Sequence, residues 1–138
     1  MAWKWNVIGI FVLLCSCMCD TSYRGRDSGH VLVVDEKSTG SSFECKTGEY
    51  LTIDMRNPGS GGYLVKEPEF DQKILQIQDQ KTIPPAENVK KAGDFGRLIY
   101  TFKAIAPGST DVVFRIYRPW EKDREAQDYL RMKVVVVR

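Results

Sequence analysis

The chain has 138 residues, with 20 Lys and Arg against 18 Asp and Glu, and a single histidine, His30. This length suits one domain with a hydrophobic core rather than two domains. The near-neutral charge, without a stripe of Lys or Arg, excludes the usual basis for binding nucleic acid. One histidine leaves little room for a Ser-His-Asp site or a two-histidine metal site. We therefore expect no enzyme, no cofactor and no metal centre.

The N-terminus has the pattern of an export signal. Lys4 precedes an apolar run at residues 7–14, which is shorter than the roughly 20 apolar residues that a membrane-spanning helix needs. The run ends in the letters LCSC, an arrangement that resembles a bacterial lipobox with Cys17 as the lipidated residue. We therefore expect a lipoprotein-type signal peptide at 1–19, a polar tether at 20–28 and one domain at 29–138.

This N-terminus predicts an exported protein, periplasmic or at the cell surface, that meets the membrane only through its lipid anchor. An ordinary cleaved signal, which would release a secreted soluble protein, is the alternative. A Cys-x-Cys-x-Cys metal site is a third interpretation, but it lacks the separated CxxC pairs of zinc sites. Cys45 stands apart from the other cysteines, either as a small buried strand residue or paired with Cys19 in an oxidising compartment.

From residue 30 on, apolar and polar residues alternate and turn residues separate the runs, which is the pattern of short β-strands. The expected strands cover residues 30–35, 49–55, 63–66, 74–79, 97–106, 111–117 and 129–137. Their expected inward residues are Leu51, Ile53, Met55, Leu75, Ile77, Leu98, Tyr100, Phe102, Ala104, Val112, Phe114, Ile116, Leu130, Met132, Val134 and Val136. Seven or eight short strands at this spacing predict an all-β, two-sheet sandwich.

Three loops have an unusual composition, and the loops of a sandwich gather at its two ends, where binding residues are commonly found. The first has an Asn-Pro corner, small residues and a tyrosine, the second is a glycine-bounded turn, and the third carries arginine and tryptophan, types enriched at binding hot spots. The candidate site residues are Asn57, Pro58, Gly59, Ser60, Gly61, Gly62, Tyr63, Gly93, Asp94, Phe95, Gly96, Arg118, Pro119 and Trp120. Each loop also has a plain interpretation: a flexible hairpin turn, a capped strand entrance, and a tryptophan folded over the edge of the core.

Taken together, the segments NPGSGGY, GDFG and RPWE, in this order, resemble the chagasin family of cysteine peptidase inhibitors, peptidase inhibitor family I42. The family pattern is Asn-Pro-Thr-Thr-Gly-Tyr, a Gly-x-Gly-Gly-like motif before a strand, and Arg-Pro-Trp followed by an acidic residue. The resemblance covers about residues 29–138, and RPWE after an alternating strand is its most specific element.

The resemblance implies an immunoglobulin-like, two-sheet antiparallel β-sandwich whose three loops form one edge. It also implies a mechanism, in which this edge enters the active-site cleft of a papain-like cysteine peptidase. Residues 57–63 would be the central wedge over the catalytic cysteine, flanked by 93–96 and 118–120. Inhibition would be reversible, without a covalent bond or a cleaved peptide, and we expect the inhibitor to be a monomer.

The chain departs from the family pattern in its central loop. Gly59 and Ser60 stand where the family has two threonines, an extra glycine is present at 61–62, and Val65 lies where the family often has tryptophan. Because glycines raise the cost of ordering a loop, we predict weaker inhibition than a threonine-bearing loop gives. Replacing Gly59 and Ser60 by threonine is predicted to tighten inhibition.

Two other functions compete with inhibition. A sandwich of this kind can serve as a surface-exposed, non-inhibitory binding or adhesion lipoprotein, since the fold alone does not decide function. A hydrolase that uses Cys45 and His30 is the third hypothesis, but no recognisable local signature surrounds either residue.

Overall fold

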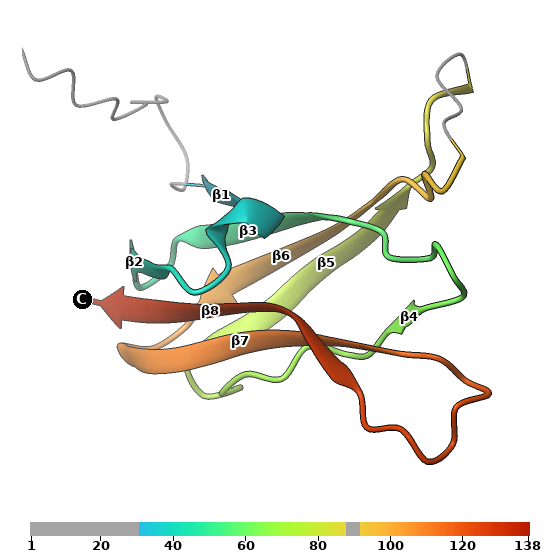
Figure 1. Ribbon diagram of the computed structural model, residues 1–138. Helices are drawn as coiled ribbons and strands as arrows, with labels where there is room; N and C mark the ends of the chain where they lie inside the picture. The colour runs from blue at the N-terminus through green and yellow to red at the C-terminus, as the bar shows by residue number, and fades with distance from the viewer. Residues whose placement is uncertain (1–30, 88–91) are drawn as a thin grey trace, which may run out of the picture.

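A computed structural model of the protein describes residues 31–87 and 92–138 (Figure 1). The predicted signal peptide, Cys17, the tether and His30 lie outside the described residues. Within them, no helix is long and apolar enough to cross a membrane. The elements there are β1 (Val31–Asp35), the short 3-10 helix η1 (Glu36–Ser38), β2 (Ser42–Lys46), β3 (Tyr50–Arg56), β4 (Leu64–Val65), β5 (Leu75–Ile83), β6 (Arg97–Ala104), β7 (Gly108–Tyr117) and β8 (Gln127–Val137).

These strands form two four-stranded sheets, with the orders β1-β3-β6-β5 and β2-β8-β7-β4 (Figure 1). The predicted all-β sandwich is therefore confirmed. The expectation of purely antiparallel sheets is wrong at two places, because β1 pairs with β3 and β2 pairs with β8 in parallel. The reason lies in the turn after β1, which carries the chain across to the other sheet. Neither edge strand then belongs to a hairpin that would impose an antiparallel direction.

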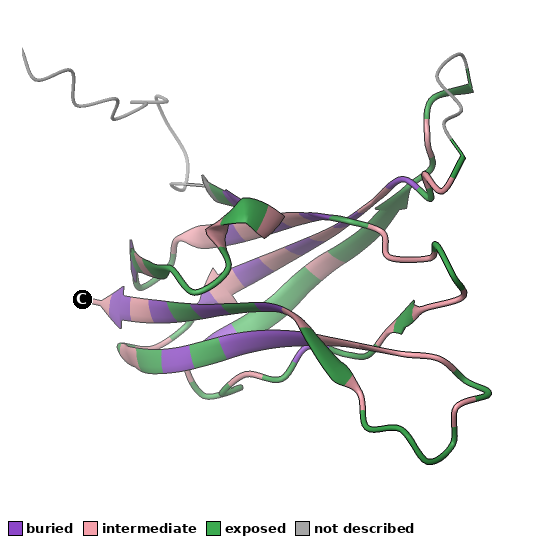
Figure 2. Cartoon of the chain, viewed as in Figure 1, coloured by how far each residue is buried: buried purple, intermediate pink, exposed green. Residues whose placement is uncertain are grey.

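The core lies between the two sheets and is built from the alternating inward faces of β3, β6, β7 and β8 (Figure 2). Phe102 and Phe114 are fully buried, and the Tyr100 ring lies 4.9 Å from the Phe114 ring between their centroids. Cys45 also faces this core from β2 at 5% exposure, and burial raises the pKa of its thiol. A protonated, buried thiol favours the packing role over nucleophilic chemistry. Its candidate disulfide partner, Cys19, lies outside the described residues.

Other differences from the predicted strands follow from edge positions and turn residues. β2 was not predicted, because its serines extend the turn-rich segment before it. Ile77 was predicted to point inward but is 37% exposed, since a bulge shifts the register of the edge strand β5 next to it. The same strand continues to Ile83, and β7 begins at Gly108, where a turn was expected.

Candidate functional site

Three loops leave the sandwich at the same end, opposite the C-terminus (Figure 1). Residues 57–63 join β3 to β4, residues 84–96 join β5 to β6, and residues 118–126 join β7 to β8. We call this the loop end. All fourteen candidate site residues lie in these loops, so the structure brings the three predicted segments together.

The central loop, residues 57–63, contains a defined turn. The side-chain oxygen of Asn57 accepts a hydrogen bond from the Gly59 N–H at 3.1 Å, and the Gly62 N–H donates to the Gly59 carbonyl at 3.0 Å. Gly61, at the third position of this turn, has a φ of 77°. A positive φ at that position favours glycine. The flexible hairpin of the sequence interpretation is therefore a turn with its own hydrogen bonds.

The second loop packs against one side of the central loop. The Phe95 ring covers Gly59 so closely that a Cβ added to this glycine would lie 2.8 Å from the Phe95 Cγ atom. Ser60 lies against Gly93, where a Cβ would come within 3.3 Å of the serine Oγ. The second loop also closes on itself, since the Gly96 N–H donates to the Asp94 carboxylate at 2.9 Å. The two loops therefore form one surface.

The third loop packs against the other side of the central loop. The Trp120 indole lies over Gly62, so that a Cβ at this glycine would overlap the ring. Trp120 nevertheless remains 63% exposed. Its ring covers the central loop and faces solvent, which excludes the interpretation of a tryptophan folded over the core. Pro119 precedes it and limits the backbone of this segment.

Arg118 holds the third loop to the central one. Its guanidinium lies 4.3 Å from the centroid of the Tyr63 ring, a cation–π contact. It also donates to Glu121 at 2.9 Å between Nη1 and Oε1, and this hydrogen bond lowers the pKa of the Glu121 carboxyl. The Arg118 Nε atom is buried without a hydrogen-bond partner among the described residues. These contacts make Arg118 an internal brace.

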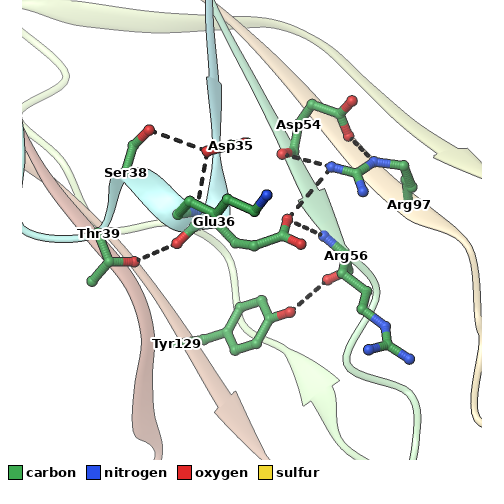
Figure 3. A network of polar contacts seen from close by, with 9 residues as sticks. Asp35, Glu36, Ser38, Thr39, Asp54, Arg56, Arg97 and Tyr129 are labelled. Atoms are coloured by element: carbon green, nitrogen blue, oxygen red, sulfur yellow. Dashed lines mark hydrogen bonds and ion pairs between the residues drawn. The ribbon is translucent and has the colours of Figure 1, made fainter.

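A polar network fixes the base of the central and second loops (Figure 3). The backbone of Arg56, the last residue before the central loop, makes two hydrogen bonds. Its N–H donates to the Glu36 carboxylate at 3.0 Å, and its carbonyl accepts from the Tyr129 hydroxyl at 2.8 Å. Arg97, the first residue after the second loop, pairs with Asp54 and with Glu36. Sequence reasoning missed this network, because its members lie far apart in the chain and carry no motif.

The base of the central loop and the base of the second loop are also joined directly, since the Asn57 N–H donates to the Gly96 carbonyl at 2.9 Å. Among residues 31–87 and 92–138, no group of three or more His, Cys, Asp or Glu side chains is arranged to hold a metal ion. The exposed features are aromatic rings, glycine-rich backbone and paired charges, which suit contact with another protein.

The structure is thus a β-sandwich with three contacting loops at one end. The family model described as "Chagasin family peptidase inhibitor I42" matches residues 44–134. The chain therefore belongs to the chagasin family of peptidase inhibitors, as the loop motifs predicted.

Solved structures share the fold at low sequence identity. The cysteine protease inhibitor EhICP2 from Entamoeba histolytica is 19% identical, with a TM-score of 0.62 over 78% of this chain and 95% of that one. Amebosin is 18% identical, with a TM-score of 0.55 over 79% and 100%. PbICP-C, solved in complex with falcipain-2, is 18% identical, with a TM-score of 0.51 over 83% and 96%. No curated protein matches the sequence at a significant level.

Proposed function

We propose that this protein is a reversible, non-covalent inhibitor of papain-like cysteine peptidases that occludes the active-site cleft with its three loops. The observation that carries the proposal is the mutual packing of the loops, in which the central loop lies between Phe95 and Trp120. Membership of a peptidase inhibitor family supports it. So does the structural likeness to EhICP2, called a cysteine protease inhibitor, and to PbICP-C, solved with falcipain-2.

In this proposal the central loop is the wedge and the other two loops flank it. A glycine-rich turn has little side-chain bulk, so it fits a narrow cleft, and its backbone N–H and C=O groups pair with the peptidase. The exposed face of Trp120 then supplies apolar contact area on one rim. Interfaces of this kind bury roughly 800 Å² per partner, an area within reach of three loops. Arg118 acts from within by holding the wedge beside the tryptophan.

Titration of papain tests the proposal. We expect the protein to inhibit papain, and we expect Trp120→Ala to raise the inhibition constant about 30-fold or more, since aromatic hot spots contribute roughly 2 kcal/mol or more. Val33→Ala is the matched control, because this side chain is equally exposed, at 64% against 63%, but lies on β1. Recovery of full activity and of an intact inhibitor after dilution tests reversibility. If neither the wild type nor Trp120→Ala affects papain at micromolar concentration, the binding or adhesion module becomes the better hypothesis.

The proposal also includes an exported inhibitor, anchored through Cys17 in the periplasm or at the cell surface. The support is the signal-like sequence that ends at this cysteine. The mass of the mature protein tests it. A lipid-modified chain that starts at Cys17 supports anchoring, whereas an unmodified mature chain supports release as a soluble protein.

A further inference from the structure

Phe95 has an unusual position for a large apolar side chain. It lies in a loop and remains 47% exposed. Its ring is nevertheless in close contact with one residue, since a Cβ added to Gly59 would lie 2.8, 2.9 and 3.2 Å from the Phe95 Cγ, Cδ1 and Cβ atoms. The ring therefore occupies the space that a side chain at position 59 would take.

The backbone gives no reason for a glycine at position 59. Positive φ values occur at Gly61 and Gly62 in this loop, but Gly59 is not among the glycines that adopt them. Any residue can therefore adopt the backbone conformation at position 59. The feature that requires glycine there is the Phe95 ring, so these two residues form a matched pair across two loops.

The segment that carries Phe95 is held in place on both sides. The Gly93 carbonyl accepts a hydrogen bond from the Arg56 guanidinium at 3.1 Å, and the Gly96 N–H donates to Asp94 at 2.9 Å. The ring is thus presented at low cost in conformational entropy, as a binding residue on a preorganised loop. Trp120 repeats the arrangement on the opposite side, where its ring covers Gly62.

We propose that Phe95 is a second aromatic anchor for the target peptidase and a determinant of its specificity. The inference rests on the proposed function and refines it: the apolar contact comes from two rings that flank the central turn, and not from side chains of the turn itself. The preferred targets are then papain-like peptidases whose cleft has an apolar wall facing residues 93–96. A peptidase whose cleft is charged or narrow at that wall binds this inhibitor more weakly.

A double-mutant cycle tests the pair in the full protein, with the inhibition constant for papain and thermal unfolding as the two measurements. Phe95→Ala is expected to weaken inhibition about tenfold, mainly through faster dissociation. Gly59→Ala displaces the ring and is expected to weaken inhibition by a similar factor. In the double variant the second change adds nothing, because the ring that it would displace is absent.

Ile105→Ala is the matched control, since this residue is 40% exposed and lies after β6 at the end opposite the loops. The loss caused by Phe95→Ala is expected to be the same at low and high salt, because the contact is apolar. Unchanged inhibition by Phe95→Ala overturns the inference, and strict additivity of the two substitutions in the cycle also overturns it. In both cases the proposed function stands. Failure of the wild type to inhibit overturns the proposed function itself. Unfolding curves identify any variant that loses activity through misfolding.

Discussion

The two ends of the sandwich are held together in different ways. At the end that carries the C-terminus, which we call the closed end, short turns bond to neighbouring strands through the backbone. The Gly48 N–H donates to the Ala104 carbonyl at 2.7 Å, and the Thr47 N–H donates to the Val137 carbonyl at 2.8 Å. At the loop end, contacts between loops depend mostly on side chains: two rings over two glycines, and Arg118 over Tyr63.

Under the proposed function, this difference separates the residues that stabilise the fold from those that bind the peptidase. Backbone hydrogen bonds at the closed end tolerate many side chains, and they complete the ladders of the two sheets. At the loop end the aromatic rings remain largely exposed, so they contribute little burial to folding and stay available for a partner. Substitutions at the loop end should therefore alter inhibition more than stability, and substitutions at the closed end should do the reverse.

The largest expected effect comes from comparing one glycine at each end. Gly62 and Gly48 both have positive φ, at 76° and 93°, so alanine at either position costs about 1–2 kcal/mol of stability. At Gly62 the new methyl group also overlaps Trp120, whereas nothing lies within 4 Å of a Cβ at Gly48. We expect Gly62→Ala to weaken papain inhibition about 30-fold, approaching the loss of the tryptophan itself. We expect Gly48→Ala to leave inhibition unchanged.

Thermal unfolding and the inhibition constant, measured on both glycine variants, decide the outcome. Equal losses of inhibition in the two variants would contradict the separation of the two ends. A Gly62→Ala variant with wild-type inhibition would show that the position of Trp120 over the central loop is not needed for binding.

A smaller effect is expected from the acid titration of Glu121. The hydrogen bond from Arg118 holds the pKa of this carboxyl below its ordinary value of 4.5 in the folded protein. Its contribution to stability is therefore fully present above pH 4.5 and is lost as the pH falls through the lowered pKa. We expect the third loop to loosen in that range, with a change in the emission of Trp120.

The measurement is the fluorescence of a protein that begins at Asp20, in which Trp120 is the single tryptophan. Glu121→Gln should emit like the acid form at every pH and should inhibit papain a few-fold more weakly at pH 6, since the ion pair is lost. Glu125→Gln, which removes an exposed carboxylate of the same loop, should titrate like the wild type. An acid transition that persists in Glu121→Gln would assign the change to another group.

The strand faces were the most predictable part of the molecule. Alternation along β3, β6 and β8 identified buried residues such as Leu51, Phe102 and Met132, because one face of each strand must cover the core. Edge strands were less predictable. Ile77 lies beside a bulge on β5, and β2 lies in parallel beside β8, and both follow from long-range pairing that local pattern does not contain.

At the loop end, the sequence identified the segments but not their contacts. Motif residues such as Pro119 and Trp120 mark a loop by composition alone. The bond from Tyr129 to Arg56 joins residues 73 positions apart, and no local pattern indicates it. No local pattern indicates the contact between Phe95 and Gly59 either. This contact revises the prediction for threonine at position 59. The threonine must displace the Phe95 ring, so we expect Gly59→Thr to weaken inhibition rather than tighten it.

The smallest effect is expected from the other half of that prediction, Ser60→Thr. Ser60 is exposed in the central turn, and its Oγ lies near Gly93, 3.3 Å from the position of a Cβ at that glycine. A β-branched side chain restricts χ1 and removes alternative conformations of the free loop. Binding then costs less conformational entropy of the central loop, so we expect inhibition to tighten by about threefold or less.

Ser109→Thr, an exposed position at the start of β7 on the closed end, is the control and should leave the inhibition constant unchanged. The two threonine variants of the central loop are expected to move inhibition in opposite directions, Ser60→Thr towards tighter binding and Gly59→Thr towards weaker binding. Tightening by both would mean that Phe95 yields its place without loss, and that loop stiffness alone sets the affinity.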